Sequence, residues 1–341
     1  MRPFLDSSSV VDDGPELLRR LDRAGYLFMR GLLPADVVRT LRLELLNIAQ
    51  EEGWTRAGTP LEDGIANPDA FAVEPQERYR KCYFRMYKRE AFHALPHHPN
   101  LTGLFERMVG EEILMHPRII GRVIFPRRDG GEDFTTPAHQ DFPHVQGTSD
   151  TFSAWFPLAD CPRQMGSLTV AEGSHMQGVY DFRPAFGAGG LEVIDPLIGR
   201  WVGGDFAAGD VLIFHSLTVH KAVPNLTDRL RLSIDCRFQR ASDPVNRDSV
   251  ELDNGPLSWE DIYADWKSTE HQYYWRKRDL HFAPFDRSFH ERRDELAFEC
   301  AAQGDRRAVS ALERILAYDP NPAKRDRAAE LLSRLSAAGP V

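Results

Sequence analysis

The residues best suited to chemistry lie in the stretch Thr136-Pro137-Ala138-His139-Gln140-Asp141. In an extended segment His139 and Asp141, two positions apart, project from the same face. An imidazole and a carboxylate on one face, joined by a distant second histidine, form the two-histidine, one-carboxylate set that holds non-heme Fe(II) and leaves coordination positions open. A His-x-Asp pattern also arises by chance, as a surface histidine beside a turn aspartate. The third ligand must therefore come from the downstream sequence.

A second histidine-bearing segment runs from Gly209-Asp210 to His220. It predicts a tight turn that feeds a strand ending in histidine, and it offers two candidate ligands, His215 and His220. Five positions apart on one extended chain, these two side chains face opposite sides. We therefore expect only one of them to point at the metal.

The strand predicted over residues 230–238 alternates apolar and polar residues, so its polar side chains share one face. They are Arg231, Ser233, Asp235 and Arg237. Buried polar residues need partners, because an unpaired buried charge is strongly destabilising. For Arg231 two partners fit: the carboxylate of a bound organic acid, gripped bidentately, or an ion pair with Asp235 or another acid.

The elements that must position these residues begin with a helix-strand-helix pattern over residues 14–53. A stretch rich in Gly, Pro and Asp without periodicity, residues 56–77, predicts a long loop of the kind that often serves as a lid. Aromatic residues over 78–93 predict a strand or helix with its rings in the core, and residues 99–110 predict a helix.

Short apolar or alternating runs between turn residues then dominate, which is typical of an antiparallel sandwich or barrel. They cover residues 119–125, 151–158, 167–170, 210–214 and 230–238. Two irregular connections, 127–135 and 177–200, interrupt them. After residue 241 the strand pattern stops. An aromatic-dense segment, 259–275, is expected to hold the tail on the domain, and residues 292–337 predict two or three amphipathic helices.

The composition excludes several classes of protein. The 341 residues carry a net charge of −9 and no long basic run, which argues against a nucleic-acid partner. We expect no secretory signal and no membrane-spanning segment. The four cysteines are scattered without a Cys-x-x-Cys pair, so we expect a cytoplasmic protein without disulfides. The oligomeric state stays open.

Several of these segments occur in the order of a known family. His139-x-Asp141 is followed by Gly166 to His175, by Gly209 to His220, and then by Asn225 and Arg231. In that order they resemble the phytanoyl-CoA dioxygenase family of Fe(II)- and 2-oxoglutarate-dependent oxygenases. The helix-strand-helix opening is also similar.

This resemblance implies a site. In that family the distal histidine is followed closely by the arginine that binds the far carboxylate of 2-oxoglutarate. His220 has Arg229 and Arg231 in that window, whereas His215 has none. The resemblance therefore implies His139, Asp141 and His220 as metal ligands. For the cosubstrate it implies Arg231, which follows the family's Asn-x-Thr pattern, with Arg229 as second choice and Trp155 as a nearby strand tryptophan.

The resemblance also implies a fold and a reaction. We expect a double-stranded β-helix (jelly roll, cupin-like) core with flanking helices over residues 1–245, and an aromatic-rich, helical C-terminal extension over 246–341. Fe(II), 2-oxoglutarate and O2 are implied, with release of succinate and CO2. Hydroxylation of an unactivated C–H in a small molecule is favoured, because related halogenases lack the carboxylate of Asp141. Desaturation, cyclisation and peroxidation use the same ligands.

Two other functions remain open at this point: a cupin-type metal oxygenase that uses no 2-oxoglutarate, and a non-catalytic binding relative. A secondary metabolite is our preferred substrate. Four arginines near the predicted strand 119–125 suggest an anionic substrate, although solvated or ion-paired arginines are the more common case. They are Arg118, Arg122, Arg127 and Arg128.

Overall fold

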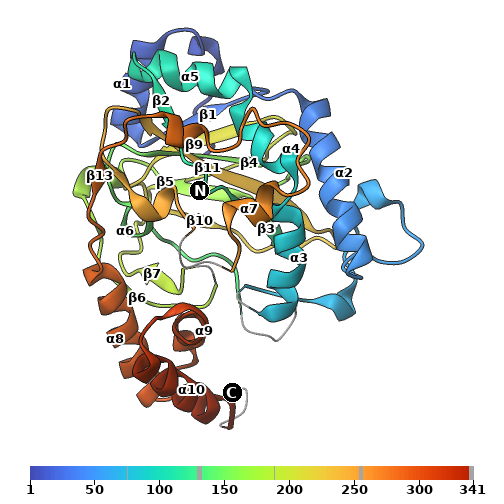
Figure 1. Cartoon of the computed structure of the whole chain (residues 1–341), viewed down its shortest axis with the longest axis vertical. Coiled ribbons are helices and arrows are strands. Elements are labelled where there is room, and N and C mark those ends of the chain that lie inside the picture. The colour runs from blue at the N-terminus through green and yellow to red at the C-terminus, as the bar shows by residue number, and fades with distance from the viewer. Residues whose placement is uncertain (75, 129–132, 188, 253–255, 338–341) are drawn as a thin grey trace.

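Two antiparallel sheets lie at the centre of the computed structural model, and helices surround them (Figure 1). The structure describes residues 1–74, 76–128, 133–187, 189–252 and 256–337. The larger sheet has the order β1-β9-β4-β11-β2, and β3 also pairs with β11. Its strands are β1 (Tyr26–Met29), β9 (Val211–His215), β4 (Phe152–Pro157), β11 (Arg231–Arg240), β2 (Ile113–Met115) and β3 (Ile120–Ile124).

The smaller sheet has the order β10-β5-β8, formed by β10 (His220–Ala222), β5 (Leu168–Ala171) and β8 (Trp201–Val202). All five predicted strand segments are confirmed, as is the antiparallel core with flanking helices. The connection 177–200 contains a hairpin of β6 (Phe182–Pro184) and β7 (Leu191–Val193). Of the connection 127–135, residues 129–132 lie outside the described residues.

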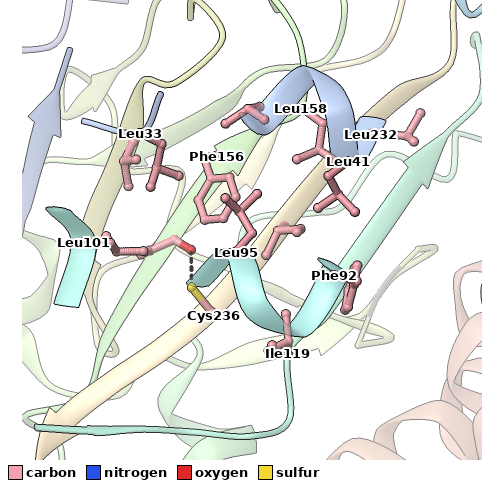
Figure 2. Packing of buried hydrophobic residues seen from close by; sticks show 14 of the residues in the cluster. Leu33, Leu41, Phe92, Leu95, Leu101, Ile119, Phe156, Leu158, Leu232 and Cys236 are labelled. Atoms are coloured by element: carbon pink, nitrogen blue, oxygen red, sulfur yellow. Dashed lines mark hydrogen bonds between the residues drawn. The ribbon is translucent and has the colours of Figure 1, made fainter. Parts of the chain in front are cut away.

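The predicted helix-strand-helix opening is confirmed by α1 (Gly14–Ala24), β1 and α2 (Ala35–Glu51). Asp13 caps α1 by accepting a hydrogen bond from the Glu16 amide, and Gly25 ends it with a φ of 80°. With α5 (Pro99–Val109), these helices bury their leucines against the larger sheet. Figure 2 shows this core around Phe156 and Leu41, with the Cys236 thiol 3.6 Å from the Ala154 carbonyl oxygen.

The aromatic segment 78–93 forms helices, α3 (Glu77–Tyr87) and α4 (Glu90–Ala94), which decides between the two predicted alternatives. The described residues of the preceding stretch contain short 3-10 turns at Leu61–Asp63 and Pro68–Ala70, and isolated β-bridges at Ile65 and Ala66. A further short helix, α6 (Phe142–Val145), follows Asp141 directly.

The aromatic segment near the C-terminus packs in the main core, with Trp259 of α7 (Trp259–Tyr263) and Trp275 both buried. One expectation was wrong: strand structure continues beyond residue 241, because β12 (Val245–Asn246) pairs in parallel with β13 (Phe282–Ala283). A strand pairing only two residues long has no recognisable sequence pattern. The boundary at residue 245 stays a prediction.

Three helices form the end of the described chain: α8 (Ser288–Ala302), α9 (Val309–Tyr318) and α10 (Pro322–Ala337). They share a hydrophobic cluster of their own and lie beside β6 and β7 at one end of the molecule (Figure 1). We call these three helices the C-terminal extension. Among the helices of the described residues, none has the length and apolar character needed to cross a bilayer.

Candidate metal centre and cosubstrate site

The two candidate histidine ligands are joined through their backbones. The His139 amide donates to the His220 carbonyl, and the His220 amide donates to the His139 carbonyl, each at 2.9 Å. Residues paired in this way on antiparallel strands place their side chains on the same face. The two rings accordingly lie with their centroids 4.1 Å apart.

Each imidazole is oriented by a backbone carbonyl. The Nδ1 atom of His139 lies 2.8 Å from the Pro137 carbonyl oxygen, and that of His220 lies 3.0 Å from the Thr218 carbonyl oxygen. These contacts place the proton on Nδ1 and leave the Nε2 lone pair free. The Nε2 atoms lie 4.0 Å (His139) and 3.8 Å (His220) from the same oxygen, Oδ1 of Asp141.

The other oxygen of Asp141 is held by the protein. Ser153 Oγ donates to Oδ2 at 2.5 Å, and Arg237 Nη2 lies 3.2 Å from it. Burial by itself would raise the pKa of Asp141, but the Arg237 guanidinium outweighs it and lowers the pKa, and the Ser153 hydrogen bond acts in the same direction. Asp141 is therefore ionised, with one oxygen positioned and one free to coordinate.

Burial and the neighbouring His220 lower the pKa of His139 to about 4, and burial also lowers the pKa of His220. Both imidazoles are therefore neutral at neutral pH, the form that binds metals. Two nitrogens and one carboxylate oxygen lie within 4.8 Å of one another, and in the described chain this is the one cluster of three potential metal ligands.

His215 lies elsewhere. Its Nδ1 accepts from the Leu217 amide, and its Nε2 lies 3.7 Å from Asp150. The cluster contains His220 and not His215, so the expectation that only one of the two points at the metal stays a prediction that this geometry supports, but its premise was wrong. His215 ends β9 in the larger sheet and His220 begins β10 in the smaller sheet, so the two do not share one extended strand.

Arg231 is buried at the start of β11 without an acidic partner. Its Nη1 donates to Ser233 Oγ, its Nε has no hydrogen-bond partner, and no ion pair of the described residues includes it. Asp235, the alternative partner, lies instead 3.8 Å from Arg237. The Arg231 guanidinium carbon lies 5.6 Å from the ring centre of Trp155. Burial lowers the pKa of Arg231 to about 10, so it stays cationic at neutral pH.

The expectation for Arg229, the second-choice ligand of the cosubstrate, is corrected by its position. Its side chain is exposed and lies 3.5 Å from Asp63, because the chain reaches β11 only at Arg231 and runs along the surface before it. The structure therefore does not favour Arg229 as a cosubstrate ligand. Asn225, two residues before Thr227, has a structural role: its side-chain amide, Nδ2, donates to the Arg229 carbonyl oxygen at 2.7 Å.

A cavity of about 440 Å³ opens beside the histidine–aspartate cluster, and His139 and Asp141 line it. Aromatic residues of α3, among them Tyr79 and Tyr83, form one wall, whereas the sequence favoured a purely structural role for them. Arg231 and Trp155 are not among the lining residues. Two lining residues lie close to them in register: Asp235 of β11, which pairs with Trp155, and Arg122 of β3, which pairs with Ser233.

Two residues that contact the cluster, Ser153 and Arg237, were not assigned to the site from the sequence. Ser153 carried no signal beyond its place in a predicted strand. Arg237 was recognised as a residue in need of a partner, but Asp141 could not be identified as that partner. The register of β4 and β11 decides it, because it pairs Ser153 with Arg237, and strand alternation alone does not give that register.

Comparison with known proteins agrees with this geometry. The model of the phytanoyl-CoA dioxygenase (PhyH) family matches residues 21–233. A 1-deoxypentalenic acid 11-beta-hydroxylase of Streptomyces arenae is 29% identical over 260 residues, which cover 70% of this chain and 86% of the relative. The peroxisomal phytanoyl-CoA dioxygenase of Rattus norvegicus is 25% identical over 226 residues, covering 63% and 64%.

Among solved structures, a non-heme alpha-ketoglutarate-dependent epimerase from nogalamycin biosynthesis is similar with a TM-score of 0.49 and 20% identity. The alignment covers 70% of this chain and 85% of the epimerase.

Proposed function

Because the chain belongs to the phytanoyl-CoA dioxygenase family of Fe(II)- and 2-oxoglutarate-dependent oxygenases, we propose that His139, Asp141 and His220 hold the iron. The donor set fits this metal: two neutral imidazole nitrogens and one carboxylate oxygen, which together leave coordination positions for other ligands. The hydrogen bonds to both Nδ1 atoms and to Oδ2 of Asp141 support the same assignment, since such contacts orient metal ligands.

We assign the far carboxylate of 2-oxoglutarate to Arg231. A buried guanidinium with an unpaired Nε and no acidic partner is costly unless an anion binds it. A carboxylate accepts two parallel hydrogen bonds from a guanidinium, which suits this position. Trp155 is also buried and lies beside Arg231. The expectation that Trp155 borders the cosubstrate stays a prediction.

When bound, Fe(II) and 2-oxoglutarate supply O2 activation coupled to formation of succinate and CO2, and thereby oxidation of a substrate C–H bond. The chain's own residues orient this chemistry. Asp141 keeps its charge through Arg237 and Ser153, and the cavity beside it receives a small molecule. We propose hydroxylation, with a secondary metabolite as the substrate class, as in the hydroxylase relative.

The single observation that carries the proposal is the convergence of His139, Asp141 and His220 with free donor atoms. Anaerobic titration of the protein with Fe(II) and 2-oxoglutarate tests it. A weak visible charge-transfer band should appear and should be absent in His220→Ala. No band in the unmodified protein would refute the metal assignment.

The same titration tests the arginine. Arg231→Ala should need a 2-oxoglutarate concentration at least about ten times higher to develop the band, as expected for loss of a charged hydrogen-bonded pair. Arg229→Ala is the matched control, because it removes a guanidinium two positions away that faces Asp63 at the surface. An unchanged 2-oxoglutarate requirement in Arg231→Ala would favour a metal oxygenase that uses no 2-oxo acid.

A further inference from the structure

Helices α3 and α9 and strand β3 each contribute an arginine to the lining of the cavity, and two of these arginines hold one carboxylate. Arg314 Nη2 lies 3.0 Å from Oε1 of Glu74, and Arg122 binds Oε2 of the same residue. Both guanidiniums and Glu74 line the cavity. Because Arg122 and Arg314 hold Glu74 from both sides, the pKa of Glu74 is lowered to about 2 despite its burial. Glu74 is therefore ionised and balances one of the two cations.

A third arginine, Arg80 of α3, lies beside them. Its guanidinium carbon is 5.8 Å from the ring centre of Tyr318, which is four residues after Arg314 and hence on the same face of α9. The Nε atom of Arg80 is buried without a partner, and among the described residues no acid lies within ion-pairing distance of its guanidinium. Arg122 and Arg314 thus share one carboxylate, and Arg80 adds a cation with no acid of its own.

The other acids that line the cavity are not paired with Arg80 or Arg314. Asp141 and Asp235 are engaged by Arg237, and Asp248 is an exposed residue of a 3-10 turn, Arg247–Ser249. His290 of α8 also lines the wall and is neutral, since burial lowers its pKa to about 4. Aromatic and aliphatic residues, among them Phe84 and Leu257, also line the cavity. A ligand with an anionic group and a hydrophobic body matches both features.

We propose that Arg80 and Arg314 form a subsite for an anionic group of the substrate, a carboxylate or a phosphate. The C-terminal extension then takes part in substrate binding, since Arg314 and Tyr318 belong to α9. The residues of α9 lie outside the segment matched by the family model, residues 21–233. Substrate selection here therefore depends on an element added to the common core. This inference rests on the proposed function for the identity of the cavity as the substrate site.

Calorimetric titration of the anaerobic protein loaded with Fe(II) and 2-oxoglutarate tests it, with decanoate, decyl phosphate and decan-1-ol as probes of equal chain length. At least one anion should bind about ten-fold tighter than the alcohol, the effect of a charge-assisted hydrogen bond. Comparing the two anions distinguishes a carboxylate subsite from a phosphate subsite. Equal binding of alcohol and anions, or no binding of either anion, would overturn the proposal.

Variants locate the subsite. Arg80→Gln and Arg314→Gln should each remove most of the preference for the anion, whereas Arg334→Gln should keep it. Arg334 is the matched control, since it is an exposed arginine of the same extension that contacts Glu330 one turn away. Glu74→Gln should act in the opposite direction and tighten anion binding, because it releases Arg122 and Arg314 from their internal carboxylate.

A purely structural role for these ion pairs would weaken binding of all three probes in Glu74→Gln, and that outcome would contradict the subsite. The charge-transfer band is recorded in every sample. A normal band without any anion preference refutes the subsite alone, while the absence of a band in the unmodified protein refutes the metal centre.

Discussion

His139 and His220 are hydrogen-bonded neighbours across two antiparallel segments, with N···O distances of 2.9 Å in both directions. The separation of their side chains is therefore set by backbone pairing. Ring orientation is set in turn by the carbonyls of Pro137 and Thr218. A site built on paired backbone needs little reorganisation to bind a metal, which lowers the entropic cost of binding.

The contact between Arg237 and Asp141 predicts an effect on metal affinity. Arg237→Met removes the cation that keeps Asp141 ionised and leaves Ser153 as the donor to Oδ2. Fe(II) should bind about ten- to hundred-fold more weakly, as is usual when a residue that orients a ligand is lost. Anaerobic Fe(II) titration measures the change.

Arg240→Met is the control for that variant. Arg240 lies on the same strand, but its side chain pairs with Glu111 and Asp150. Its replacement should leave the Fe(II) affinity as it is. Equal weakening in both variants would mean that β11 tolerates no loss of arginine, and that Asp141 is not positioned through Arg237.

Buried neutral His93 predicts a loss of stability in acid. Burial lowers its pKa from 6.5 to about 4 in the folded protein. Below pH 6.5 the unfolded chain takes up a proton that the folded protein does not, so the stabilisation is complete above pH 6.5 and declines as the pH falls toward 4. At about 1.4 kcal/mol per pKa unit, the loss from this residue reaches about 3 kcal/mol.

Urea unfolding of the metal-free protein at a series of pH values between 7 and 4 measures this slope. His93→Phe should reduce it, at the expense of the contact between His93 Nε2 and the Tyr87 carbonyl. His281→Gln, at an exposed position, should not change it. An identical slope in His93→Phe and the unmodified protein would contradict the assignment.

Gly209, in the turn that leads into β9, predicts a strong requirement for glycine. Its φ is 97°, and a Cβ placed there would lie 2.2 Å from the Leu33 carbonyl oxygen. Gly199 also has a positive φ, 79°, but has open space around the Cβ position. Gly199→Ala should cost about 1–2 kcal/mol from backbone strain alone.

Gly209→Ala should cost more than about 3 kcal/mol, because Leu33 or β9 must also move. The free energies of unfolding in urea compare the two variants directly. Similar costs would show that the turn yields easily and that only the positive φ matters.

Much of the fold follows from local pattern. The strand of residues 230–238 was predictable because its apolar and polar residues alternate, and the helices because their leucines recur with helical spacing. The ligand types were also evident from the His-x-Asp spacing of His139 and Asp141, although the extended backbone expected there ends at Asp141, which has a helical backbone and directly precedes α6. These features depend on neighbours in sequence, and backbone geometry converts them directly into a face or an element.

Tertiary structure decided what depends on long-range pairing. It placed His215 and His220 in different sheets, turned Arg229 to the surface, and set Ser153 and Arg237 beside Asp141. It also brought Arg314 of the C-terminal extension into a cavity wall with Glu74. The sequence could not reveal these contacts, because a strand's alternation sets which residues share a face but not which distant residues that face meets.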